Sequence, residues 1–225
     1  MAKRSFKINN LVFGSGETQM NIKKLIVLLA LFFATTVQAD NVESVSELLR
    51  LPAYCKGTQQ IREISGDPVP IEEYIKRYGL GYNHLHHYCW ALNSENNAVY
   101  MSDRDLAHSK IFHAISDIDY VLRNNHDPKF FFLPEIYVSK ARILFKLNQP
   151  DDAVPWLKKA IALRPNYSPA YARISDYYVE KGDKAEAVKI LKQGIAKSNK
   201  SDMLIHRLRE LESQGGDAAK SGKIK

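Results

Sequence analysis

The densest cluster of chemically reactive side chains in this sequence is the run His84-Leu85-His86-His87-Tyr88-Cys89-Trp90. On a helix, His84 and His87 would share one face, and imidazoles one turn apart can bind a metal ion. No carboxylate and no second histidine pair stands at ligand spacing nearby. We therefore expect these rings to pack against neighbouring helices and their nitrogens to bond backbone carbonyls. A metal-binding protein that uses His84 and His87 is the less favoured alternative.

Sequence motifs of catalysis and cofactor binding are missing. The chain contains no Cys-x-x-Cys-His for haem attachment, no Gly-x-Ser-x-Gly, no His-Glu-x-x-His and no Walker-type phosphate loop. Hydrolases, metalloproteases and nucleotide-binding enzymes therefore have no support in the sequence. We expect a protein that is not an enzyme and that uses no cofactor and no metal.

Cys55 and Cys89 are the only two cysteines, and both lie in the first half of the chain. In an exported protein, thiols leave the reducing cytosol and tend to pair. A disulfide between them would close a medium-sized loop and stabilise the fold by roughly 3 to 4 kcal/mol. The alternative is two buried free thiols that behave as small hydrophobic side chains in a helical core.

The expectation of export comes from the start of the chain. The positive stretch Met20-Asn-Ile-Lys-Lys leads into an unbroken run of apolar and small residues from Leu25 to Val37. This order is typical of a secretory signal peptide over 20–39, cleaved after Ala39, with residues 1–19 as a leader upstream of the working start. The run is shorter than the roughly 18 to 20 residues that cross a bilayer. We therefore expect a periplasmic or secreted protein, with a retained inner-membrane anchor as the alternative.

The charge of the chain is concentrated at its start. The 225 residues carry a formal net charge of +7, and five basic side chains against one acidic side chain lie before residue 40. The remaining body is therefore nearly neutral, with the 45% hydrophobic and 25% charged residues of an ordinary globular protein. We expect no nucleic-acid binding, and membrane contact only through the signal segment if it is not cleaved.

An internal repeat starts at Pro134 and again at Ser168, which is a period of about 34 residues. Large residues at equivalent positions fill the interior of a helix pair, and small residues let the two helices approach closely. The matched pairs are Tyr137 and Tyr171, Ala141 and Ser175, Leu144 and Tyr178, Ala153 and Ala187, Leu157 and Leu191, Ala160 and Gly194, and Ile161 and Ile195.

These residues resemble the tetratricopeptide repeat, most clearly over 152–165 and 182–191. The sequence departs from the family pattern at Lys140, where an aliphatic residue is usual, and at Asn199, where proline is usual. The resemblance implies an all-α fold, a right-handed superhelical stack of helix-turn-helix units with a helical N-terminal extension, in a bacterial exported protein.

The resemblance also divides the chain into regions. Two repeats are fewer than the three or so that bury a continuous core, so the preceding region has to supply a neighbour. The expected regions are a helical N-terminal region over 40–133 that includes a degenerate repeat at about 81–125, two repeats over 134–201, a capping helix over 202–213 and a disordered tail over 214–225. Within the N-terminal region, helices are expected at Val42–Leu51, Ile71–Tyr78, Gly81–Leu92 and Arg104–Asn124, with an enlarged connection over 93–103.

The family resemblance implies a function in protein–protein interaction, with a peptide or partner protein held in the groove of the stack. A scaffold subunit of an envelope assembly is the alternative. The Lys and Asn pairs with which some tetratricopeptide proteins clamp a peptide carboxylate are not reproduced here. By the family pattern, the groove-facing residues are Glu135, Val138, Arg142, Phe145 and Lys146 in the first repeat, and Pro169, Ala172, Asp176, Val179 and Glu180 in the second.

Overall fold

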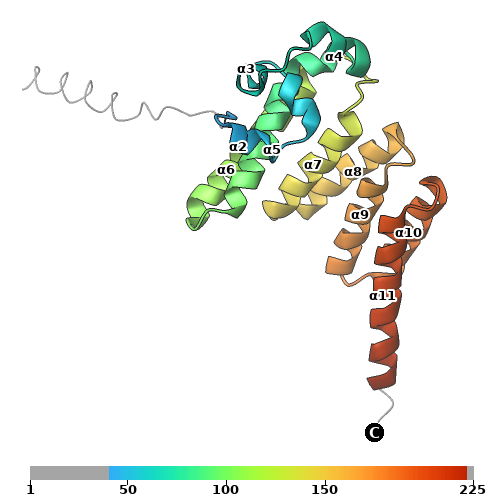
Figure 1. Cartoon of the computed structure of the whole chain (residues 1–225). Coiled ribbons are helices and arrows are strands. Elements are labelled where there is room, and N and C mark those ends of the chain that lie inside the picture. Colours follow the sequence, from blue (N-terminus) through green and yellow to red (C-terminus); the bar gives the residue numbers. More distant parts are fainter. Residues whose placement is uncertain (1–40, 222–225) are drawn as a thin grey trace, which may run out of the picture. The chain divides into compact units, whose positions relative to one another are not determined.

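The computed structural model describes the backbone of residues 41–221 and the side chains of residues 41–213. Over this range the chain forms ten α-helices and two 3-10 helices, with no strand (Figure 1). The all-α fold class expected from the sequence is therefore confirmed. The expected signal peptide at 20–39 lies outside the described residues. No helix within them is long and apolar enough to span a membrane.

Short helices make up the N-terminal part of the described chain. They are α2 (Val45–Leu48), the 3-10 helix η1 (Ala53–Gly57), α3 (Ile61–Ser65), α4 (Ile71–Tyr78) and the 3-10 helix η2 (Leu80–His84). The bounds of α4 are as expected, whereas α2 is shorter than the expected Val42–Leu51. Ser44 caps α2 at its start by accepting a hydrogen bond from the amide of Glu47, and Pro52 disfavours helix at the residue before it.

Three longer helix pairs and a final helix follow, running from green to red in Figure 1. They are α5 (Leu85–Val99) with α6 (Arg104–Asn124), α7 (Leu133–Lys146) with α8 (Pro150–Leu163), α9 (Ser168–Glu180) with α10 (Lys184–Lys197), and then α11 (Asp202–Ser221). Each pair packs helix against helix. The turns within the two repeats place Asn148 and Gly182, at equivalent positions, in the left-handed backbone region with φ of 59° and 77°. Glycine and asparagine adopt this conformation at the least cost, so both repeats make the same turn.

The helix α5 is longer than the sequence suggested. It continues through most of the expected connection at 93–103, so the connection to α6 is only four residues long. The polar residues Asn93 and Glu95, which fall in the expected connection, are instead buried in the helix. Glu95 is satisfied there by Arg142 and Lys146 of α7, a partnership that is not visible in local sequence.

Small residues at the helix crossings establish the register of the repeats. Ala153, Ala160 and Ala187 are fully buried where α7 meets α8 and α9 meets α10. A Cβ atom added to Gly194 would lie 2.7 Å from the side chains of both Tyr171 and Leu204, so no larger residue fits without a shift. The pairings expected from the repeat period therefore hold at the helix crossings.

The departure from the family pattern at Lys140 is accommodated by neighbouring side chains. Lys140 is buried on α7, and its ammonium group forms an ion pair with Asp119 of α6. The same ammonium lies 3.9 Å from the ring centre of Trp156, and Lys159 lies at the same distance. A cation over an indole ring is attracted by the ring's electron density, so Trp156 and Asp119 together offset the cost of burying this charge.

The last helix runs beyond the expected end of the capping helix at residue 213. α11 continues through Gly215 and Gly216 to Ser221, so the backbone is helical in the first part of the tail that we expected to be disordered. Extending a helix that already exists avoids the cost of a new nucleus, and Ala218, Ala219 and Lys220 have high helix propensity.

Candidate binding groove

A pocket of about 540 Å³ opens between α5 and α7. Both helices are the first of their pair, and the first turn of α9 closes the pocket on one side. The segment that links α2 to η1 closes it on another side. The residues that line the pocket are Arg50, Pro52, Tyr88, Leu92, Glu95, Asn96, Val99, Glu135, Val138, Ser139, Arg142, Lys146, Tyr167 and Pro169.

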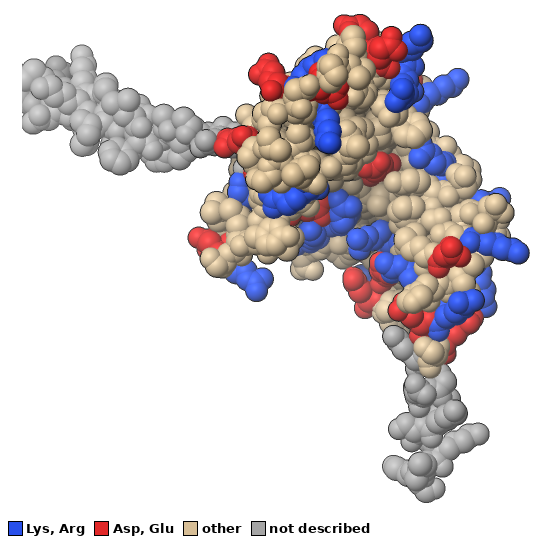
Figure 2. Space-filling model, in the orientation of Figure 1, with Lys and Arg blue, Asp and Glu red and all other residues tan. Residues whose placement is uncertain are grey.

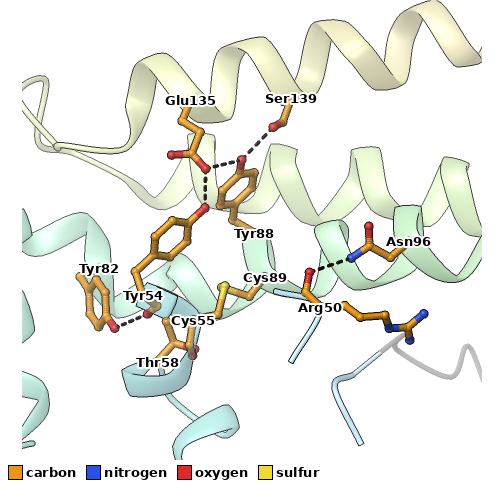
Figure 3. Close-up of a disulfide and its surroundings, with 10 residues drawn as sticks. All are labelled: Arg50, Tyr54, Cys55, Thr58, Tyr82, Tyr88, Cys89, Asn96, Glu135 and Ser139. Carbon is orange, nitrogen blue, oxygen red and sulfur yellow. Dashed lines mark hydrogen bonds between the residues drawn. A yellow bond between two sulfur atoms is a disulfide. The ribbon is translucent and has the colours of Figure 1, made fainter. Parts of the chain in front are cut away.

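Glu135, at the start of α7, accepts hydrogen bonds from two tyrosines of different regions (Figure 3). Tyr54 of η1 donates its hydroxyl to Glu135 Oε1, and Tyr88 of α5 donates to the same oxygen over 3.2 Å. The hydroxyl of Tyr88 also lies 2.7 Å from that of Ser139. Because Tyr88 donates its single hydroxyl proton to Glu135, Ser139 is the donor in the bond between the two hydroxyls. The carboxylate therefore joins the N-terminal region, α5 and α7.

The pKa values of both tyrosines are raised. Burial is the main cause for each, and the negative charge of Glu135 adds to it. Both hydroxyls stay protonated and act as hydrogen-bond donors, so neither supplies a phenolate nucleophile to the pocket.

A second carboxylate in the pocket, Glu95 of α5, is held by two cations of α7. Arg142 donates to both its oxygens, over 2.7 Å from Nε and 2.6 Å from Nη2, and Lys146 Nζ lies 2.7 Å from Oε1. Burial by itself would raise the pKa of Glu95, but the hydrogen bonds and charges of Arg142 and Lys146 outweigh it and lower the pKa. Glu95 is therefore ionised and fully occupied by partners within the chain.

The cysteines lie directly behind the pocket. The structure joins the sulfur atoms of Cys55 and Cys89, with 5.8 Å between the Cα atoms, and both residues are fully buried (Figure 3). The carbonyl of Cys55 accepts from the hydroxyl of Thr58 over 2.8 Å, and the carbonyl of Tyr54 accepts from that of Tyr82 over 2.7 Å. The cysteine pair ties η1 to α5, and the bond from Tyr82 ties η1 to η2, so both fix the position from which Tyr54 reaches Glu135.

Arg50 is an exposed residue of the pocket lining. Its guanidinium donates to Asn97 Oδ1 over 2.7 Å and lies 5.8 Å from the ring centre of Tyr100. Its carbonyl accepts from Asn96. The charged end of this exposed side chain therefore has a defined position at the pocket entrance.

The structure divides the expected groove residues between two pockets. Glu135, Val138, Arg142, Lys146 and Pro169 line the first pocket. Asp176, Val179 and Glu180 line a second pocket of about 340 Å³ between α9 and α11, together with Ser175, Arg207, Glu210 and Leu211.

Two of the expected groove residues line neither pocket. Ala172 is buried to 3% exposure in a cluster with Tyr171, Leu191 and Leu204, because α11 covers this part of α9. Its expected place in the groove is therefore wrong. Phe145 is half-buried and packs against Tyr177 at 6.3 Å between ring centres.

Sequence reasoning missed the half of the first pocket that α5 and the N-terminal segment provide. Its members are Arg50, Pro52, Tyr88, Leu92, Glu95, Asn96 and Val99. Applying the repeat register to α5 as the first helix of its pair would have indicated the α5 residues. Arg50 and Pro52 belong to no repeat, and no signal in the sequence points to them.

The histidine cluster packs against α6. His87 Nδ1 lies 2.8 Å from Asp117 Oδ1, and its ring lies 3.9 Å from that of Tyr120. The expected packing of rings is present, but the partner of His87 is a carboxylate and not a backbone carbonyl. Among the residues that the structure describes, no three His, Cys, Asp or Glu side chains are grouped so that they could hold a metal ion.

Comparison with known proteins identifies the helix pairs of the C-terminal part. Residues 135–210 match the tetratricopeptide repeat family. The helix stack also resembles the crystal structure of a thermophilic tetratricopeptide protein of Thermus thermophilus, with a TM-score of 0.51 and 16% identity over 62% of this chain and 68% of that one. This likeness supports the expected tetratricopeptide fold. No curated protein matches the sequence.

Proposed function

We propose that this protein is an exported, non-enzymatic interaction module of the bacterial envelope that holds a segment of a partner protein in the pocket between α5 and α7. The observation that carries the proposal is the composition of this pocket. The first helices of three successive pairs line it, which is the arrangement with which stacked helix pairs present a concave surface.

The lining of the pocket fits an extended peptide. Apolar surface from Leu92, Val99 and Val138 alternates with the charged groups of Arg50 and Lys146. A volume of about 540 Å³ accommodates a few side chains of a bound segment, which would gain both apolar burial and directed polar contacts.

The polar groups of the pocket support binding over catalysis. Glu135 and Glu95 each accept hydrogen bonds from donors of the chain itself, and Tyr54 and Tyr88 stay protonated. An acid, base or nucleophile has to offer a free proton, lone pair or charge to a substrate. These groups are instead committed to holding α5, α7 and η1 together.

Export is the part of the proposal that rests on the start of the chain. The apolar run before residue 40 is typical of a cleaved signal peptide, and a pair of buried cysteines within bonding distance fits an oxidising compartment. A retained inner-membrane anchor is the competing outcome. It would leave the same groove facing the same compartment.

Site-specific photo-crosslinking in growing cells tests the groove. A photoreactive amino acid at Val99, which lines the pocket and is 70% exposed, is expected to form a defined crosslinked band with a partner. The matched control is the same amino acid at Lys158, which is exposed on α8 away from the pocket. Equal crosslinking at both positions, or none at Val99, would contradict binding in this groove.

A further inference from the structure

Equivalent positions of the two tetratricopeptide repeats carry opposite charges. Arg142 and Lys146 of α7 are replaced, one repeat later, by Asp176 and Glu180 of α9. The position between them is apolar in both repeats, as Phe145 and Val179. The same face of the stack therefore changes from cationic to anionic from one repeat to the next.

The first pocket offers positive charge to a ligand. Three cations and two carboxylates line it, and both carboxylates are already occupied by partners of this chain. Arg50 is exposed at the mouth, and the side chain of Lys146 is 39% exposed. The three cations exceed the two carboxylates by one, because the donors to Glu135 are neutral and Arg142 and Lys146 share Glu95. The positive groups that reach solvent at this pocket are Arg50 and Lys146.

The second pocket offers negative charge. One cation, Arg207, and three carboxylates line it. Arg207 is committed to an ion pair with Asp176. Glu180 and Glu210 are exposed at this pocket, and the exposed His206 lies near Glu210. Figure 2 shows Lys and Arg side chains interspersed with Asp and Glu, so the face in this view has no single sign that would favour a nucleic acid or a bilayer.

Both pockets contact α9. Pro169 in its first turn lines the first pocket, and Asp176, Val179 and Glu180 in its last turns line the second. α7 and α9 are neighbours in the stack. Neighbouring helices lie about 8 to 10 Å apart, a distance that about three residues of extended chain cover.

We propose that the groove binds an extended segment of a partner protein that is bipolar, with acidic residues over Arg50 and Lys146 and basic residues over Glu180 and Glu210. About three positions separate the residue over Lys146 from the residue over Glu180. This inference rests on the proposed function and specifies its ligand. Opposite charges at the two ends fix which end of the segment lies over which repeat, and a segment of one sign is attracted at one pocket and repelled at the other.

Peptide selection tests both the groove function and the bipolar ligand. The protein is purified from cells that express the full chain and is used to select binders from a random peptide display library. Enriched peptides are expected to carry an acidic and a basic cluster at the stated spacing. Enriched peptides that are neutral or of one sign would overturn the bipolar ligand and leave the groove function standing. A library from which no peptide is enriched would overturn the groove function as well.

Variants at the two ends assign each cluster to its pocket. Lys146→Gln is expected to lower the affinity for a selected peptide about three- to tenfold. It should leave unchanged the affinity for the same peptide with its acidic residues replaced by glutamine. Glu180→Gln is expected to behave in the same way toward the peptide whose basic residues are replaced.

Two exposed residues of α8 provide matched controls, because Lys158→Gln and Asp152→Asn make the same charge changes outside both pockets. Circular dichroism of all four variants should show parent-like helicity. Equal weakening by the pocket variants and the controls would contradict the assignment, since bulk charge would then account for the effect.

Discussion

Tyr54 and Glu135 are 81 residues apart in the chain, and a hydrogen bond from the tyrosine hydroxyl to the carboxylate connects them. Tyr54 lies in the non-repeating N-terminal region, next to Cys55, and Glu135 lies in the first turn of the first repeat. The N-terminal region is therefore part of the pocket wall and braces the first repeat.

Removal of the Tyr54 hydroxyl should weaken this brace. In Tyr54→Phe the ring still packs against Phe132, at 4.4 Å between ring centres, but Glu135 loses one of its two donors. We expect the free energy of unfolding, measured in urea, to be about 1 to 2 kcal/mol lower than in the parent. Tyr74→Phe is the control, because Tyr74 donates to Asp67 outside the groove. An equal decrease in the free energy of unfolding in both variants would mean that the bond to Glu135 stabilises the fold no more than the bond to Asp67.

The cysteine pair should behave as a bridge. Intact-mass analysis after alkylation without reductant should show no modified cysteine. Cys55→Ser should cost a few kcal/mol and increase hydrogen exchange over residues 40–80, while the repeats from Pro134 onward stay protected. Two alkylated thiols in the protein as isolated would refute the bridge and would also weaken the case for an oxidising compartment.

The helix crossings should not tolerate larger side chains. Ala153→Leu and Ala187→Leu each add three carbon atoms at fully buried positions and should destabilise the repeats by about 1 to 3 kcal/mol. Thermal melts followed by circular dichroism measure the loss. Ala162→Leu on the exposed face of α8 should melt with the parent. A parent-like melt of either crossing variant would show that the register is wrong.

Acid should destabilise the protein through His86. Burial is the main reason that its pKa is lowered to about 4, and the charges of His87 and His84 lower it further. Between pH 6.5 and about 4 the unfolded chain therefore binds more protons than the folded one, so the free energy of unfolding decreases as the pH falls. The loss attributable to His86 is at most about 3 kcal/mol.

Urea unfolding of His86→Phe at both ends of this pH range isolates the contribution. The variant should lose less stability on acidification than the parent, whereas His108→Phe, at an exposed position of α6, should lose as much as the parent. The carboxylates of Glu47 and Glu95 have lowered pKa values and add their own loss in stronger acid, in the parent and both variants alike. An unchanged pH dependence in His86→Phe would contradict the prediction.

The mature protein should begin at Asp40. A fusion of the full chain to a reporter that is active only outside the cytosol should be active. Mass spectrometry of the extracted protein should find Asp40 at the amino terminus, whereas Met20 or Met1 at that position would indicate a retained anchor.

The repeats were readable from the sequence because their packing is local and periodic. Ala153, Leu157 and Ala160 recur as Ala187, Leu191 and Gly194, and each set meets a partner helix only a few residues away. The period therefore predicted α7 to α10, and the resemblance to the tetratricopeptide repeat pointed to five residues that line the first pocket.

The rest of the groove depends on contacts between distant segments. The burial of Glu95 depends on its ion pairs with Arg142 and Lys146, which lie on another helix. Arg50 lines the pocket but has no counterpart in either repeat. Ala172 follows the family pattern but is covered by α11, whose position is set by Leu204 packing against Tyr171 and Leu191. Periodicity cannot predict such contacts, because each is made once.

The two tryptophans are placed so that each reports on a different part of the fold. Trp90 is buried in the cluster that contains Cys55 and Cys89, and Trp156 packs among the repeats beneath Lys140 and Lys159. The disulfide is expected to quench the fluorescence of Trp90, whereas the fluorescence of Trp156 depends on the ammonium groups of Lys140 and Lys159. The chain therefore carries two natural optical probes with different quenchers, and whether their signals change together during denaturation tells whether the braced end and the repeats unfold as one cooperative unit.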